Sequence, residues 1–168
     1  MIRHPVDRAV SLFRLEMAQS SAAVQKNETD GDVMLDSFSL ARWAHSDNHD
    51  NHNWMTRHLS NHFDGDLLPA HLETAKEILR RFCIIGLLES KDESMRRILQ
   101  YFNLELNSDR SIACKDRILN WGWRNKITYA KLDHESPVFK TLAKMNAYDM
   151  ELYEFARRLF IHQAKLFE

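Results

Sequence analysis

The sequence predicts an α/β chain that is mostly helical and holds one or two short parallel strands. Three observations lead to this fold class. Apolar residues recur at helical spacing in several segments, and the run Cys83–Leu88 is continuously apolar over the length of a strand. In addition, Met1 and Ile2 lead directly into a helix start, as the end of a strand does. At 168 residues the chain has the size of one domain with a sizeable core.

The first helix is predicted to begin at Pro5, because proline suits the first turn of a helix. An apolar stripe follows at helical spacing, formed by Val6, Val10 and Phe13. Arg8 and Ser11 are three residues apart and therefore share another face. Arg3 stands just before the helix, where free N–H groups and a partial positive charge of roughly half a unit favour anions. Arginine, free amides and a hydroxyl at one place make a phosphate site.

This arrangement resembles the 3′-phosphate-binding motif of the sulfotransferases that use the donor PAPS (3′-phosphoadenylyl sulfate). Arg3, Pro5, Arg8 and Ser11 match that motif, whereas His4 stands where the family usually has Asp or Asn. The resemblance implies that Arg3 and Ser11 bind the 3′-phosphate of PAPS. The alternative for this segment alone is an ordinary amphipathic helix with a solvated arginine.

PAPS-dependent enzymes also have an earlier Gly- and Ser/Thr-rich loop that binds the 5′-phosphosulfate through backbone N–H groups. The four glycines of this chain are scattered, and none opens such a loop. We therefore expect residues 1–168 to be the C-terminal part of a single sulfotransferase domain, a partial P-loop-type sulfotransferase fold without its 5′-phosphosulfate loop. On this expectation the chain alone is inactive.

The segment Asn53–Leu59 resembles an Asn, two residues, Thr-Arg, one residue, Leu pattern of several carbohydrate sulfotransferases. In relatives this segment lies near the acceptor side of the cleft. Two roles are open for Arg57, which could meet an anionic sugar or a structural carboxylate, and we favour the structural one.

Five of the nine histidines fall between residues 45 and 62, which raises the question of a metal site. His45 and His49 are four residues apart, as are His58 and His62. Zinc is one interpretation of this spacing. However, the Asn, Asp and Ser residues around them indicate a loop, and no H-E-x-x-H motif is present. We therefore assign no metal ligand.

The middle of the chain predicts a helix, a short strand and a second helix. The helix before the strand is predicted to span Leu67–Phe82. Its apolar stripe consists of Leu72, Ala75, Ile78, Leu79 and Phe82. After the strand Cys83–Leu88, Ser90 and Glu93 have the spacing of a capping box. The predicted buried face of the second helix consists of Met95, Ile98, Leu99 and Phe102. Glu89, at the carboxyl end of the strand, is either a site residue or a plain surface carboxylate.

The segment Trp121–Thr128 pairs cations with aromatic rings, a neighbourhood that suits an adenine ring and a phosphate. In the family, a basic loop late in the chain closes over PAPS. The resemblance makes Arg124 and Lys126 candidate PAPS contacts. A solvated basic turn with core tryptophans is the alternative.

The last two helices are predicted to start at Pro137 and near Ala147, with Asn146 between them. Residues 146–156 are similar to the closing pattern of the family: Asn, two residues, Asp, two residues, Leu-Tyr, one residue, Phe-Ala. We assign this helix to packing and not to chemistry. A coiled-coil helix is the rival interpretation, but one helix lacks the three to four heptads required.

The resemblance implies transfer of a sulfuryl group from PAPS to a hydroxyl, with a carbohydrate as the acceptor. A Golgi membrane or lumen location for the full-length protein is implied in the same way, although these residues hold no targeting signal or membrane span. A net charge of −1 argues against nucleic acid or an anionic membrane surface as a partner. The general base remains unassigned. The alternative function is a non-catalytic remnant that binds a partner as a helical domain.

Overall fold

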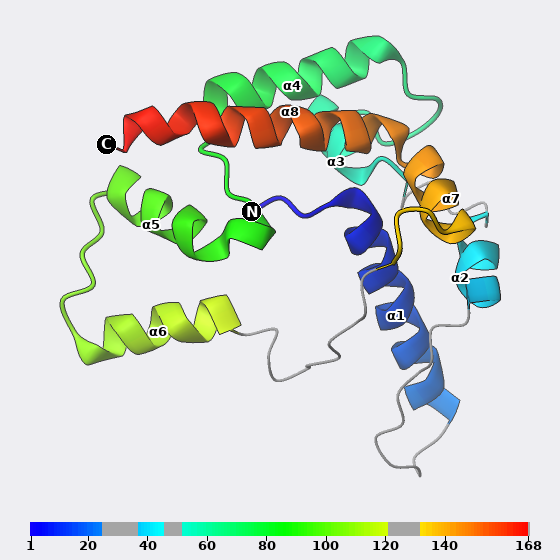
Figure 1. The fold of residues 1–168 in the computed structure, drawn as a ribbon, viewed down its shortest axis with the longest axis horizontal. Coiled ribbons are helices and arrows are strands. Elements are labelled where there is room, and N and C mark those ends of the chain that lie inside the picture. The colour runs from blue at the N-terminus through cyan, green and yellow to red at the C-terminus, as the bar shows by residue number, and fades with distance from the viewer. Residues whose placement is uncertain (25–36, 46–51, 121–131, 168) are drawn as a thin grey trace.

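The computed structural model describes residues 1–24, 37–45, 52–120 and 132–167. These residues are mostly helical (Figure 1). The α-helices are α1 Pro5–Val24, α2 Ser37–Ala44, α3 Trp54–Ser60, α4 Pro69–Phe82, α5 Lys91–Tyr101, α6 Asp109–Asn120, α7 Pro137–Met145 and α8 Ala147–Gln163. Two short 3₁₀ helices are η2 Leu88–Ser90 and η4 Ala164–Leu166.

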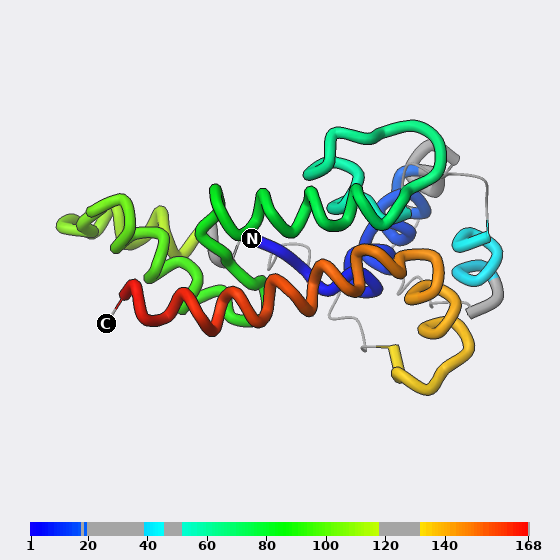
Figure 2. The backbone as a smooth tube through the Cα atoms, turned by 90° about the horizontal axis from the view of Figure 1, so that it is seen from above, coloured from blue at the N-terminus to red at the C-terminus, as the bar shows by residue number. Residues whose placement is uncertain are grey.

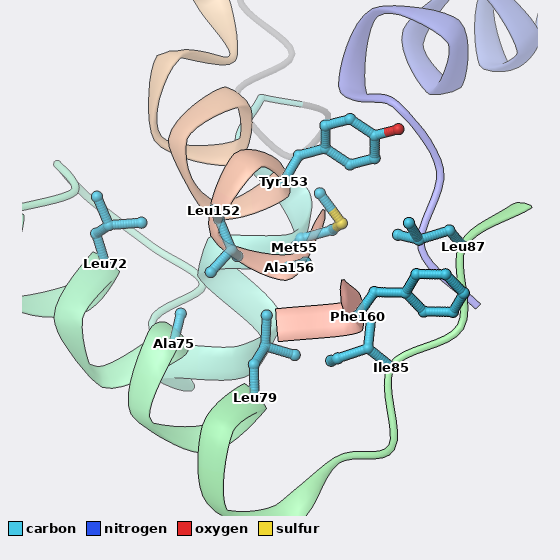
Figure 3. Close-up of a cluster of buried hydrophobic side chains, with 10 residues drawn as sticks. All are labelled: Met55, Leu72, Ala75, Leu79, Ile85, Leu87, Leu152, Tyr153, Ala156 and Phe160. Carbon is cyan, nitrogen blue, oxygen red and sulfur yellow. The ribbon is translucent and has the colours of Figure 1, made fainter. Parts of the chain in front are cut away.

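Helices α4 and α8 lie side by side and run in the same direction (Figures 1 and 2). Helix α3 packs against both of them. The resulting hydrophobic cluster, drawn in Figure 3, consists of Met55, Leu72, Ala75, Leu79, Ile85, Leu87, Leu152, Tyr153, Ala156 and Phe160. Each large apolar side chain buried here contributes about 1.5–3 kcal/mol to folding.

A second cluster joins α1, α2 and α7. Its buried members are Val6, Ala9, Val10, Phe13, Leu40, Ala44, Val138 and Leu142. The stripe predicted for the first helix therefore faces the core as expected. Because α1 and α8 contact each other as well, the first residues of the chain lie between the two clusters.

The predicted parallel strands are not confirmed among the described residues, where extended pairing is limited to one bridge. Ile2 forms an isolated parallel bridge with Leu87. The Ile2 N–H donates to the Gly86 carbonyl at 2.6 Å, and the Leu88 N–H donates to the Ile2 carbonyl at 2.8 Å. The segment Cys83–Leu88 is thus extended and meets the N-terminal residues in the parallel direction.

Side chains satisfy other backbone groups of the same extended segment. The Gln163 side chain accepts from the Ile85 N–H at 2.9 Å and donates to the Cys83 carbonyl at 2.8 Å. The Ser94 hydroxyl accepts from the Leu87 N–H at 2.8 Å and donates to the Leu87 carbonyl at 3.0 Å. Buried backbone groups require partners, and here two side chains supply them where a sheet would use a neighbouring strand.

The buried face of α5 differs from the predicted one. Its buried residues are Ser94, with no exposed surface, and Arg97, which is 5% exposed, while Phe102 is 62% exposed. The Arg97 guanidinium lies 3.9 Å from the centroid of the Phe160 ring and donates to the Phe160 carbonyl at 2.6 Å. The helix is therefore turned so that an arginine, with its charge stabilised by ring and carbonyl, faces α8.

Two smaller predictions for this region were also wrong. Phe82 ends the predicted stripe of α4 but is 79% exposed. Glu93 forms no capping box with Ser90, because its carboxylate binds Arg96 and Arg97, each at 2.7 Å. These two arginines also hold the pKa of Glu93 down at about 2.

Candidate functional site

Helix α1 begins at Pro5, as predicted. The Arg8 N–H donates to the His4 carbonyl at 2.9 Å, closing the first helical turn. Arg3 precedes this turn, and Ser11 lies about 9 Å further along the helix axis than Pro5 at the usual rise per residue. Both side chains are partly buried, and neither has a hydrogen bond or ion pair with another residue that the structure describes.

Arg8 does not share this lack of partners. Its guanidinium lies over the ring of Trp54 on α3, 4.7 Å from the ring centroid. Burial lowers the pKa of Arg8, and the nearby Asp149 carboxylate acts in the opposite direction. Arg8 therefore ties α1 to α3, whereas no such contact is found for Arg3 or Ser11 among the described residues.

Two further segments with family resemblance, Asn53–Leu59 and residues 146–156, bind each other in what we call the α3–α8 junction (Asn53, Thr56, Asn146 and Asp149). The Asn53 side chain accepts from the Asp149 N–H at 3.1 Å. The Asn53 N–H in turn donates to the Asn146 side chain at 3.0 Å. Asn53 has φ = 52°, a left-handed conformation that asparagine tolerates better than most residues.

Asp149 provides the cap of α3 from another helix. Its carboxylate accepts from the Met55 N–H at 2.9 Å, the Thr56 N–H at 2.8 Å and the Thr56 hydroxyl at 2.8 Å. Burial raises the pKa of Asp149, and these three donors oppose that rise. A carboxylate at a helix N-terminus satisfies free N–H groups and the helix dipole together.

Arg57 has a structural role, as favoured, although its partners are carbonyls and not a carboxylate. The side chain is 8% exposed. Its Nη1 donates to the carbonyls of Gly65 at 3.0 Å, Phe63 at 3.3 Å and His62 at 3.4 Å. These bonds hold the chain that leaves α3, so nothing in this geometry presents the guanidinium to a sugar.

A third group of side chains surrounds the entry to α1. The Tyr153 hydroxyl of α8 donates to the Glu89 carboxylate. The His4 ring lies edge-on to the Tyr153 ring, with 5.1 Å between centroids, and is stacked 6.0 Å from the Phe139 ring of α7. Burial is the main cause of a lowered pKa for His4. Burial therefore favours the neutral form of the imidazole at the position after Arg3.

With this geometry in place, a comparison with protein families decides the affiliation. The model of the Sulfotransferase family matches residues 1–156, which include α1, the α3–α8 junction and most of α8. The chain belongs to the sulfotransferase family. A comparison with curated proteins and one with solved structures gave no match.

Within this sulfotransferase the predicted donor contacts fall into two groups. Arg3 lies just before the start of α1 and Ser11 lies within the helix, and their binding of the 3′-phosphate stays a prediction. Arg124 and Lys126 lie outside the described residues. Tyr153 also lies near the start of α1, because its ring contacts the ring of His4. The sequence did not point to Tyr153, since its Leu-Tyr pair fits a helix that only packs against the core.

His58 and His62, which are four residues apart, both have partners within the protein. The His58 ring is hydrogen-bonded to the Trp54 carbonyl at 2.8 Å, and the His62 ring stacks on the His71 ring at 3.9 Å. Among the residues that the structure describes, no three His, Cys, Asp or Glu side chains gather as ligands would. The described helices also include none with the length and apolar character of a membrane span.

Proposed function

We propose that this sulfotransferase transfers a sulfuryl group from PAPS to a hydroxyl of a carbohydrate, and that Arg3 and Ser11 bind the 3′-phosphate. The observation that supports this most is the state of these two side chains. Arg3 lies just before α1 and Ser11 lies within it, in the spacing of the family motif, and neither has a hydrogen-bonding partner among the described residues. The α3–α8 junction, by contrast, uses its polar groups internally.

When bound, PAPS supplies an activated sulfuryl group. In the transfer, a bond forms between the acceptor oxygen and sulfur while the bond from sulfur to the nucleotide phosphate oxygen breaks, and the acceptor proton passes to a base that is not assigned here. By analogy with phosphoryl transfer, the protein contributes positioning and charge neutralisation. Arg3 and Ser11 hold the nucleotide end, where each charge-assisted hydrogen bond is worth about 1.5–3 kcal/mol.

In this proposal, residues 1–168 form the C-terminal part of one sulfotransferase domain. None of their glycines opens a phosphate-loop motif in the sequence, so in this proposal a segment outside these residues binds the 5′-phosphosulfate. The parallel bridge between Ile2 and Leu87 is then a small part of the family's sheet. Arg124 and Lys126 as donor contacts and a Golgi location of the full-length protein remain predictions of the same proposal.

The test compares adenosine 3′,5′-bisphosphate with adenosine 5′-monophosphate in NMR titrations of the purified chain. We expect weak binding with a preference for the 3′-phosphorylated nucleotide. Arg3→Ala should reduce that preference at least about tenfold, since it removes a charge-assisted contact. The exposed Arg96 provides the matched control, and Arg96→Ala should leave the preference unchanged. Absence of any preference in the unmodified chain would favour the non-catalytic alternative.

A further inference from the structure

The residues on both sides of Arg3 have hydrogen-bonded backbone groups. On one side, both backbone groups of Ile2 are bonded, its N–H to the Gly86 carbonyl and its carbonyl to the Leu88 N–H. On the other side, the His4 carbonyl accepts from the Arg8 N–H, and the His4 ring is packed. The backbone at Arg3 therefore runs between two fixed points.

Tyr153 contacts both segments that leave the parallel bridge. Because Ile2 and Leu87 are paired in parallel, His4 and Glu89 follow the bridge at the same end, each two residues beyond it. The Tyr153 ring meets the His4 ring, and its hydroxyl donates to the Glu89 carboxylate. Figure 3 shows this hydroxyl pointing out of the hydrophobic cluster, on the side of the N-terminal segment.

We propose that Tyr153 is a positioning residue of the 3′-phosphate site, which it serves by holding His4 and Glu89 so that the backbone of Arg3 is set before the nucleotide binds. This inference rests on the proposed function. A guanidinium on a fixed backbone loses less conformational freedom when it binds a phosphate than one on a mobile terminus. Tyr153 itself does not touch the nucleotide in this account.

Tyr153→Phe is the sharpest test, because it removes the hydroxyl and keeps the packed ring. The matched control is Tyr148→Phe on the same helix, where the lost hydroxyl donates to the Leu67 carbonyl at 3.2 Å. We expect Tyr153→Phe to lower the preference for adenosine 3′,5′-bisphosphate over adenosine 5′-monophosphate roughly three- to tenfold. Tyr148→Phe should leave the preference unchanged, and both variants should keep the helical circular-dichroism spectrum.

A second variant separates positioning from general packing. Glu89→Ala removes the other partner of the hydrogen bond, so it should lower the same preference by a similar factor. Combined with Tyr153→Phe it should add little, because the two changes break one interaction. Equal losses for both nucleotides would indicate a merely structural role and overturn the inference.

A measurement that needs no nucleotide tests the positioning role of Tyr153 independently of the proposed function. Hydrogen exchange at the Leu88 N–H reports whether the bridge to Ile2 is held. Tyr153→Phe should accelerate this exchange severalfold, and Tyr148→Phe should not. If the unmodified chain prefers neither nucleotide, the proposed function fails, and with it the assignment of a phosphate site. If the preference exists but Tyr153→Phe changes neither it nor the exchange, only the positioning role fails.

Discussion

The α3–α8 junction and the entry of α1 are both built from polar residues with family resemblance, yet they use those residues in opposite ways. In the junction, Asp149 accepts three hydrogen bonds and Asn53 is bonded through its backbone and its side chain. At the entry of α1, Arg3 and Ser11 have no such partner among the described residues. The polar groups of the junction are therefore bonded to one another, whereas ligand binding by Arg3 and Ser11 is what we propose.

Polar residues of a family motif can therefore have two different physical roles, which are to stabilise the fold or to bind a ligand. A buried polar group that is fully bonded stabilises one arrangement of helices, and its loss leaves other groups unpaired. A polar group without a partner contributes little to folding, but its donors are ready for an incoming anion. Variants of the junction should therefore lower stability, whereas variants of Arg3 and Ser11 should weaken nucleotide binding.

The largest loss of stability is expected for Asp149→Ala. The change leaves the Met55 N–H, the Thr56 N–H and the Thr56 hydroxyl without their acceptor. We expect the free energy of unfolding to fall by about 3–5 kcal/mol, measured by urea denaturation. The control is Glu151→Ala, on the same helix as Asp149, which breaks an ion pair with Lys76 of α4 and should cost less than about 1 kcal/mol. Similar losses in the two variants would mean that the junction does not hold the fold.

An intermediate effect is expected from acid, through His4. Its pKa is lowered in the folded state, mainly by burial, from an ordinary value of 6.5. The unfolded chain therefore takes up a proton at higher pH than the folded one, so stability is full above pH 6.5 and falls as the pH drops below it. The carboxylates of Asp7, Glu89 and Glu154 limit this effect, whereas His134 adds to it.

The matched variant for this pH effect is His4→Phe, which keeps an aromatic ring and removes the titrating group. Urea denaturation from about pH 8 to about pH 5 should give a shallower decline for His4→Phe than for the unmodified chain. Equal declines in the two proteins would show that protonation of His4 does not cause the loss of stability at low pH.

The smallest effect on stability is expected for Arg3→Ala and Ser11→Ala. Neither side chain has a hydrogen-bonding partner among the described residues, so each change should stay within about 0.5 kcal/mol in urea denaturation. The same variants should nevertheless weaken nucleotide binding. A loss as large as that of Asp149→Ala would place Arg3 or Ser11 among the groups that hold the fold.

The parts of the fold that depend on local chemistry could be predicted from the sequence. Pro5, Pro69 and Pro137 each mark the first turn of a helix, and the Ser136 side chain caps α7 by accepting from the Phe139 N–H. These signals act within a few residues of the helix start. The parallel strands and the buried face of α5 were predicted less well, because their outcome depends on distant partners such as Gln163 and Phe160.

In the candidate site too, residues in a local motif could be predicted, whereas contacts between residues far apart in the sequence could not. Arg3 and Ser11 could be named because a phosphate motif is short and local in sequence. The contact between Tyr153 and Glu89 joins residues 64 positions apart, which no spacing rule reveals. The available signal was a tyrosine hydroxyl within an apolar helix stripe, since such a group usually finds a partner when buried.

The bonding of the segment Cys83–Leu88 also bears on self-association. Backbone groups along an extended chain alternate between its two edges, and an uncovered edge invites another chain to add as a strand. One edge here is taken by Ile2, and the other by the side chains of Gln163 and Ser94. Several backbone groups on each edge of this apolar run are thereby paired within the chain, which leaves fewer of them to template aggregation.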